Sequence, residues 1–150
     1  VYKLAARSGA DGSLIPTMKF SDNPDKTTNP GIKQVWRLYH EDGTVKADVL
    51  ALEGETINPG EPGKFHHPSN DYQSFMFIPA KAVPLLTKKM IGGVRYGTEP
   101  SLNEIRSRVQ AGLEQLDRTY KRILNPHIFK VSLSEELRDL KFGFMREYGK

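Results

Sequence analysis

The chain has 150 residues, of which 22 are basic and 18 acidic, so its formal net charge at pH 7 is +4. It contains no cysteine, which excludes a disulfide scaffold and thiolate metal sites, and no apolar run approaches the roughly 20 residues that a membrane helix needs. The charge excess is milder than the dense basic patches typical of nucleic-acid-binding proteins, and the length suits one domain with a real core.

The first half of the sequence alternates in the way that β-hairpins do. We expect strands at 1–6 and 17–20 around a turn-rich stretch, and a second pair at 34–40 and 44–52. Asp42 and Gly43 lie between the second pair, and both residue types tolerate a positive φ, which favours a tight hairpin turn. Residues 72–78, 82–90 and 94–96 are predicted as further strands. Two polar loops, 21–31 and 54–71, separate these segments, and a loop as long as the second is uncommon unless it binds or wraps something.

From residue 100 the apolar period changes to that of a helix. Ser101 and Glu104 have the capping-box pattern of a helix start, and apolar residues continue at helical spacing to Leu124, where Asn125–Pro126 ends the helix. Residues 128–132 are a short strand or an extended link, and Ser134 begins a second helix. Antiparallel β-hairpins followed by two C-terminal helices predict an α+β fold. We expect a β-rich region at 1–99 and a helical region at 100–150 that together form one domain.

The histidines are the first candidates for chemistry, and they are His40, His66, His67 and His127. Only His66 and His67 are clustered, with Asp71 and Glu61 as groups that could complete a metal site. A zinc site needs three or four convergent ligands, whereas neighbours on an extended chain point to opposite faces. A surface loop therefore explains the pair more simply, and we expect no metal site.

The remaining polar groups offer weaker patterns. Residues 26–31 followed by Lys33 have the amides, hydroxyls and lysines that could hold a phosphate, but they lack a Walker or GxGxxG pattern, and a solvated turn is the default interpretation. The carboxylates at turns and helix starts form no acid–base pair, and the helix macrodipole accounts for those at a helix N-terminus; they are Glu53, Glu55, Glu135 and Glu136. We assign no catalytic residue.

Basic residues also recur beside aromatic ones, at Lys88, Lys89, Arg95, Tyr96, Arg118, Tyr120, Lys121 and Arg122. Such a set can bind RNA when the rings stack on bases. Tyr120, however, falls on the apolar stripe of the predicted helix, and the charges suit its wet face. We expect neither a nucleic acid nor a membrane as partner.

Five segments, in order and spread over nearly the whole chain, resemble the C-terminal part of nicotinate phosphoribosyltransferase. They are Val1–Leu4 (VYKL), Pro24–Gly31 (PDKTTNPG), Gln34–Tyr39 (QVWRLY), Pro100–Arg106 (PSLNEIR) and Leu124–Ser134 (LNPHIFKVSLS). The chain also begins with Val1 inside a predicted strand rather than with methionine. Together these features lead us to expect a C-terminal fragment or domain of a longer enzyme.

The resemblance implies an enzyme that joins nicotinate to phosphoribosyl pyrophosphate, giving nicotinate mononucleotide and pyrophosphate for NAD biosynthesis in the cytoplasm. It also implies Mg²⁺, coupling to ATP through a phosphorylated histidine, an irregular α/β barrel and paired subunits. None of the four histidines here matches that histidine's motif, which lies upstream together with the phosphate-binding loops. We therefore expect this chain to be structural and inactive alone, to brace the barrel, and to self-associate without it.

Two alternatives remain open. The first is an independent binding module for a phosphate-bearing ligand that uses Lys26, Lys33 and neighbouring basic residues. The second is a scaffold whose two C-terminal helices dock a partner.

Overall fold

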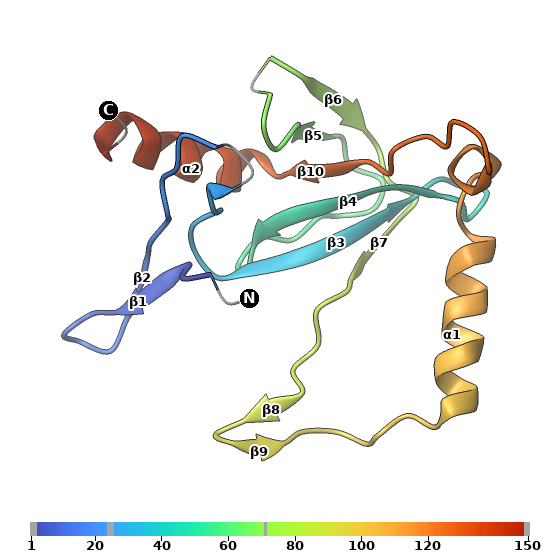
Figure 1. Ribbon diagram of the computed structural model, residues 1–150, viewed down its shortest axis with the longest axis horizontal. Helices are drawn as coiled ribbons and strands as arrows, with labels where there is room; N and C mark the ends of the chain where they lie inside the picture. Colours follow the sequence, from blue (N-terminus) through green and yellow to red (C-terminus); the bar gives the residue numbers. More distant parts are fainter. Residues whose placement is uncertain (1–2, 24–25, 71, 149–150) are drawn as a thin grey trace.

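The computed structural model describes residues 3–23, 26–70 and 72–148. Its centre is a six-stranded sheet in the order β6-β5-β10-β4-β3-β7 (Figure 1). Neighbouring strands are antiparallel except β10 and β4, which are parallel. The bounds are β3 (Lys33–Tyr39), β4 (Val45–Leu52), β5 (Gly63–His66), β6 (Ser74–Phe77), β7 (Lys81–Pro84) and β10 (Val131–Leu133). Because the chain combines this sheet with two α-helices, the predicted α+β class is confirmed.

The hairpin β3–β4 forms where the alternating sequence predicts it. Gly43 has a φ of 80°, and the Asp42 carboxylate accepts hydrogen bonds from the backbone N and hydroxyl of Thr44 at 2.8 and 2.6 Å, which fixes the turn. Buried and half-buried residues alternate along all of β4. The core is centred on Leu38, Val49 and Phe65, with partly buried aromatic side chains packed around them.

Helix α2 (Glu135–Tyr148) packs against β4 and β5 and buries Leu137 completely. Ser134 begins it, as predicted, because its hydroxyl accepts a hydrogen bond from Leu137 N at 3.2 Å. The same hydroxyl donates to Glu55 Oε1 at 2.7 Å. The start of the helix is thereby tied to the loop that follows β4.

The strand bounds differ from the prediction at three places. The first hairpin pairs β1 (Ala6–Ser8) with β2 (Leu14–Pro16), further in than 1–6 and 17–20, because Gly9 N bonds Ser13 O at 2.7 Å and tightens the turn. The predicted strand 82–90 ends at Pro84 instead. This proline lies in the edge strand β7, and it has no backbone N–H to donate to a ladder. β5 was expected to be loop, since its single buried apolar residue, Phe65, produces no alternation.

Helix α1 (Leu102–Glu114) starts at the predicted capping box, with hydrogen bonds of 2.6 and 3.3 Å between Ser101 and Glu104. It does not reach Leu124. The Gln115 carbonyl accepts a hydrogen bond from Val45 N at 2.9 Å, and Asp117 caps a short 3₁₀ helix, η2 (Arg118–Lys121), by accepting from Thr119 N at 2.8 Å. Pairing with the sheet therefore ends the helix, and no local signal reveals it.

Between the sheet contacts of Leu86 and Gln115 the chain leaves the sheet as an arm, which we define as residues 87–114. It contains the hairpin β8 (Met90–Ile91) and β9 (Val94–Arg95), followed by α1, and Figure 1 shows it extending away from the sheet. Its near end is held by Gln34 Nε2, which donates to Leu86 O at 3.1 Å. No helix among the described residues is long and apolar enough to cross a bilayer.

A substitution at Gly31 tests how tightly the loop before β3 packs against Leu52. Its φ is 79°, and a Cβ there would lie 3.0 Å from Leu52 Cδ2, whereas a Cβ on Gly12, at φ 81°, would meet nothing within 4 Å. We expect G31A to lower the free energy of unfolding by about 2 kcal/mol and the control G12A by about 1 kcal/mol, as measured by chemical denaturation. Equal losses would show that Leu52 yields freely.

Candidate functional site

The two adjacent histidines point to opposite faces, as expected for an extended chain, but the predicted surface loop is wrong for His66, which lies buried in strand β5. His66, at the end of β5, is 4% exposed, and neither ring nitrogen has a hydrogen-bond partner among the described residues. His67 turns outward, and its Nδ1 accepts hydrogen bonds from the backbone N atoms of Ser69 and Asn70 at 3.1 and 3.0 Å. Glu61 is engaged by Asn58 Nδ2 at 2.9 Å, and Asp71 lies outside the described residues. No three His, Asp or Glu side chains in the described ranges could hold a metal ion.

The unpartnered His66 ring makes stability depend on pH. Burial lowers its pKa from 6.5, and the positive charges of Arg138 and Lys64 add to the effect. The unfolded chain then binds the proton more tightly than the folded one, so protonation favours unfolding.

We expect His66 to leave the free energy of unfolding unchanged above pH 6.5. Below pH 6.5 the free energy of unfolding should fall as the pH drops, because the unfolded chain takes up the proton. One proton contributes a slope of up to about 1.4 kcal/mol per pH unit. H66L should reduce this slope in denaturation curves taken between neutral and mildly acidic pH. The control H127Q removes an exposed imidazole and should retain the slope; the same slope in H66L would contradict the assignment.

The candidate phosphate loop uses its polar groups internally. Lys33 Nζ is turned into the loop and donates to the carbonyls of Asn29 at 2.9 Å, Pro30 at 3.4 Å and Gly31. Thr28 Oγ1 accepts from Lys19 N at 2.8 Å. Burial lowers the Lys33 pKa, and Lys26 is exposed. This loop is organised around Lys33 rather than open to a ligand.

The acidic residues gather at the N-terminus of α2. Glu55 accepts hydrogen bonds from Leu52 N at 2.5 Å and Ser134 Oγ at 2.7 Å, and burial raises its pKa. Glu135 and Glu136 occupy the first turn of α2, where the macrodipole favours them. Both arrangements are explained by folding alone.

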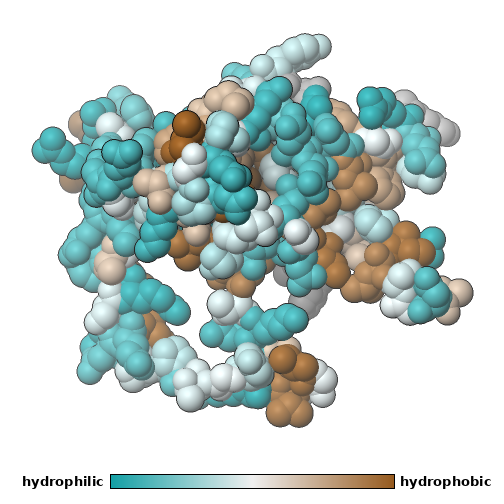
Figure 2. All heavy atoms as spheres, turned by 180° about the vertical axis from the view of Figure 1, so that it is seen from behind, coloured by the Kyte–Doolittle hydropathy of each residue, from teal (hydrophilic) through white to brown (hydrophobic). Residues whose placement is uncertain are grey.

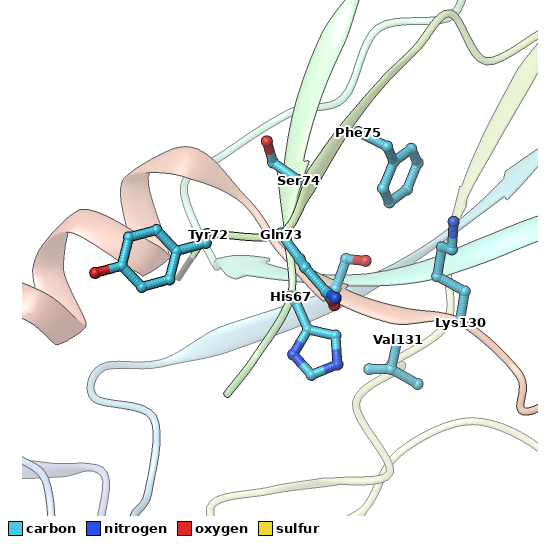
Figure 3. Close-up of a pocket in the computed structure, with 8 residues that line it drawn as sticks. His67, Tyr72, Gln73, Ser74, Phe75, Lys130 and Val131 are labelled. Atoms are coloured by element: carbon cyan, nitrogen blue, oxygen red, sulfur yellow. The ribbon is translucent and has the colours of Figure 1, made fainter. Parts of the chain in front are cut away.

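The arrival of β10 beside β5 creates a shallow pocket of about 360 Å³ that the sequence did not predict (Figure 3). His67 and Gln73 lie side by side on one wall and Lys130 rises on the other. The Lys130 ammonium lies 4.3 Å from the centre of the Phe75 ring, a cation–π contact that already satisfies part of its charge. The pocket can accept a polar group, but its cation is engaged.

A larger cavity, of about 560 Å³, lies between helix α2 and the loop that follows β5. Lys141 lines it and is 9% exposed, and burial lowers its pKa. Its Nζ donates to Pro68 O at 2.8 Å. The other lining residues are Ser21, Thr27, Pro68, Ser69, Asn70, Tyr72, Phe142 and Met145. Sequence reasoning missed this site because a lysine in mid-helix normally faces water.

The arm is exposed over almost its whole length. All its residues are exposed except Ile105 and Gly112, which are half-buried. The exposed fractions reach 69% at Val94 and 71% at Leu102, and Figure 2 shows hydrophobic residues at the β8–β9 tip. A two-stranded hairpin this short and a helix without buried residues are not stable by themselves. The arm therefore has the properties of a docking surface.

Two of the basic and aromatic residues considered for RNA binding are engaged within the fold. Arg95 pairs with Glu99 at 2.7 Å. Tyr120 packs edge-on against Phe129 and His127, at 5.4 and 6.4 Å between ring centres. Its ring is thereby used within the fold rather than presented to a base.

Comparisons with known proteins agree on one family. A sequence model of the nicotinate phosphoribosyltransferase C-terminal domain matches residues 32–141. The nicotinate phosphoribosyltransferase of Bacillus subtilis is 33% identical over 91% of this chain and 28% of its own length, and that of Homo sapiens is 33% identical over 93% and 25%. The crystal structure of human nicotinic acid phosphoribosyltransferase superposes with a TM-score of 0.72 and 30% identity, over 78% of this chain and 23% of that one. The chain thus spans about a quarter of the length of these relatives.

Proposed function

The chain belongs to the nicotinate phosphoribosyltransferase family, as its C-terminal domain, and we propose on this premise that it is the structural C-terminal part of an enzyme that joins nicotinate to phosphoribosyl pyrophosphate. The parent enzyme would release nicotinate mononucleotide and pyrophosphate, with ATP consumed, for NAD biosynthesis in the cytoplasm. The family match over residues 32–141 supports this proposal.

The chemistry belongs to the rest of the parent polypeptide. The described residues offer no group of three acidic or histidine side chains for Mg²⁺, and the lysine of the candidate phosphate loop is held by backbone carbonyls. We assign Mg²⁺ and ATP to the rest of the parent polypeptide and no reaction step to this domain. A stand-alone phosphate-binding module at Lys26–Lys33 is not favoured for the same reason.

The observation that carries a structural role is the uncovered arm. On α1 the apolar residues Leu102, Val109 and Leu113 share one stripe at helical spacing and are all exposed. About three quarters of the relatives' length lies outside this chain, so a large body of protein is available to cover the stripe. We assign the arm to the contact with that upstream part, in an enzyme whose subunits also pair.

A charge placed on the stripe tests this contact. In the full-length parent we expect V109D/L113D to lower the free energy of unfolding by about 3 kcal/mol or more, since two apolar side chains would lose their buried surroundings. Thermal or chemical denaturation, followed by pyrophosphate release from nicotinate and phosphoribosyl pyrophosphate, would measure the loss.

The matched control is S107D/A111D, which adds the same two charges at the same spacing on the opposite face of α1. It should leave both stability and turnover near the wild-type values, because that face stays in water. Equal effects from the two double variants would contradict docking through the stripe.

A separate experiment tests whether catalysis requires the upstream part of the parent. We expect the full-length parent to transfer the phosphoribosyl group to nicotinate and the 150-residue chain to show no turnover at the same concentration, because we assign the catalytic groups to the upstream part of the parent. A coupled assay of nicotinate mononucleotide would measure both. Turnover by the isolated chain would overturn the structural role.

A further inference from the structure

Two lysines of this domain are withdrawn from water, and they differ in how their charge is satisfied. Lys33 donates to three carbonyl oxygens, which matches the three protons of an ammonium group. Within the described chain Lys141 has one acceptor, Pro68 O at 2.8 Å. A buried cation with two unused donors is costly unless a further acceptor is supplied.

The surroundings of Lys141 have room for a further hydrogen-bond acceptor. The cavity of about 560 Å³ is open next to it, and no carboxylate among the described residues lines that cavity. Asn70 Oδ1 accepts from Tyr72 N at 3.2 Å, so the amide of Asn70 keeps its donors. The Ser69 hydroxyl has no hydrogen bond within the described residues, although its backbone N is engaged by His67.

The apolar part of the lining limits what can enter. Phe142 and Met145 come from α2, one and four residues after Lys141, and with Pro68 they form a non-polar surface beside the ammonium group. Such a cavity suits a small molecule with a compact anionic end and a less polar body. The positive charge of Lys141 disfavours a divalent cation in this cavity.

We propose that the Lys141 cavity binds the oxyanion of a small metabolite, a phosphate monoester or a carboxylate. The Lys141 ammonium makes a charge-assisted hydrogen bond to the anion, and Ser69 and Asn70 supply neutral donors. The site lies on the sheet-and-α2 body rather than on the arm, so the proposal stands apart from the structural role assigned above.

Acylation of lysines in the full-length parent measures how accessible Lys141 is, and phosphate bound elsewhere in the protein does not affect this measurement. A desolvated ammonium group gives up its proton more readily and reacts as an amine. We expect Lys141 to be acylated in the free protein, and saturating methyl phosphate or acetate to reduce its labelling by about tenfold, as followed by peptide mass spectrometry. Exposed Lys26 should be labelled equally with and without the anion.

A variant that keeps the lysine tests the rest of the site. S69A should raise the concentration of anion needed for half-protection of Lys141 by roughly fivefold, the value of one lost hydrogen bond. The matched control S107A removes an exposed hydroxyl on α1 and should leave that concentration unchanged. Folding of each variant is checked by its melting temperature before labelling.

The outcomes separate the possible sources of the acceptor. Protection at lower concentration by methyl phosphate identifies a phosphate monoester, and by acetate a carboxylate. If neither anion changes the labelling of Lys141, or if Lys141 is unreactive in the full-length parent before any anion is added, a group of the polypeptide already covers it and the proposal is wrong. Protection of Lys26 to the same extent would also overturn it, because the effect would then be that of the anion on the reagent.

Discussion

The pairing of β10 with both β4 and β5 is the constraint on which the rest of the domain depends. Only three residues are involved, Val131–Leu133, yet they join the β3–β4 hairpin to the β5–β6 hairpin in one sheet. Ser134 N continues the ladder to Leu50 O at 2.8 Å and its side chain begins α2 at once. The position of the last helix is therefore set by a strand that pairs in parallel with residues some 80 positions earlier, and both pockets beside residues 67–73 follow from it.

Several polar groups of the sheet and its flanking loops are paired with one another. Arg37 and Asp48 pair across β3 and β4 through two hydrogen bonds of 2.8 Å, and this contact raises the Arg37 pKa. Glu55 and Ser134 connect the loop after β4 to α2. Other buried groups have no hydrogen-bond partner among the described residues, namely both ring nitrogens of His66, Trp36 Nε1 and Asn29 Oδ1. Within the same part of the chain, the Lys141 ammonium has only one acceptor. Such unmatched buried groups are costly and call for an explanation.

The arm contains a helix that starts at its local signals and buries no residue against the described part of the domain. Its capping box, apolar stripe and polar face are all as the sequence predicts, and its ends are fastened to the sheet by Gln34 and Gln115. A segment that is held at both ends and exposed between them is well placed to pack against another surface. This is consistent with a domain whose relatives are about four times as long.

The sequence by itself determined the α+β class, the hairpin at Asp42–Gly43, both helix starts and, through five ordered motifs, the family, because turn chemistry, caps and motif order are local properties. Residue chemistry alone would have stopped at an α+β module. Tertiary structure decided where α1 ends, since Gln115 is captured by Val45, and made a strand of Gly63–His66, whose one buried apolar residue carries no period. It also placed Lys141 beside a cavity, because its acceptor, Pro68 O, comes from a segment 73 positions away, whereas the acceptors of Lys33 lie in its own loop.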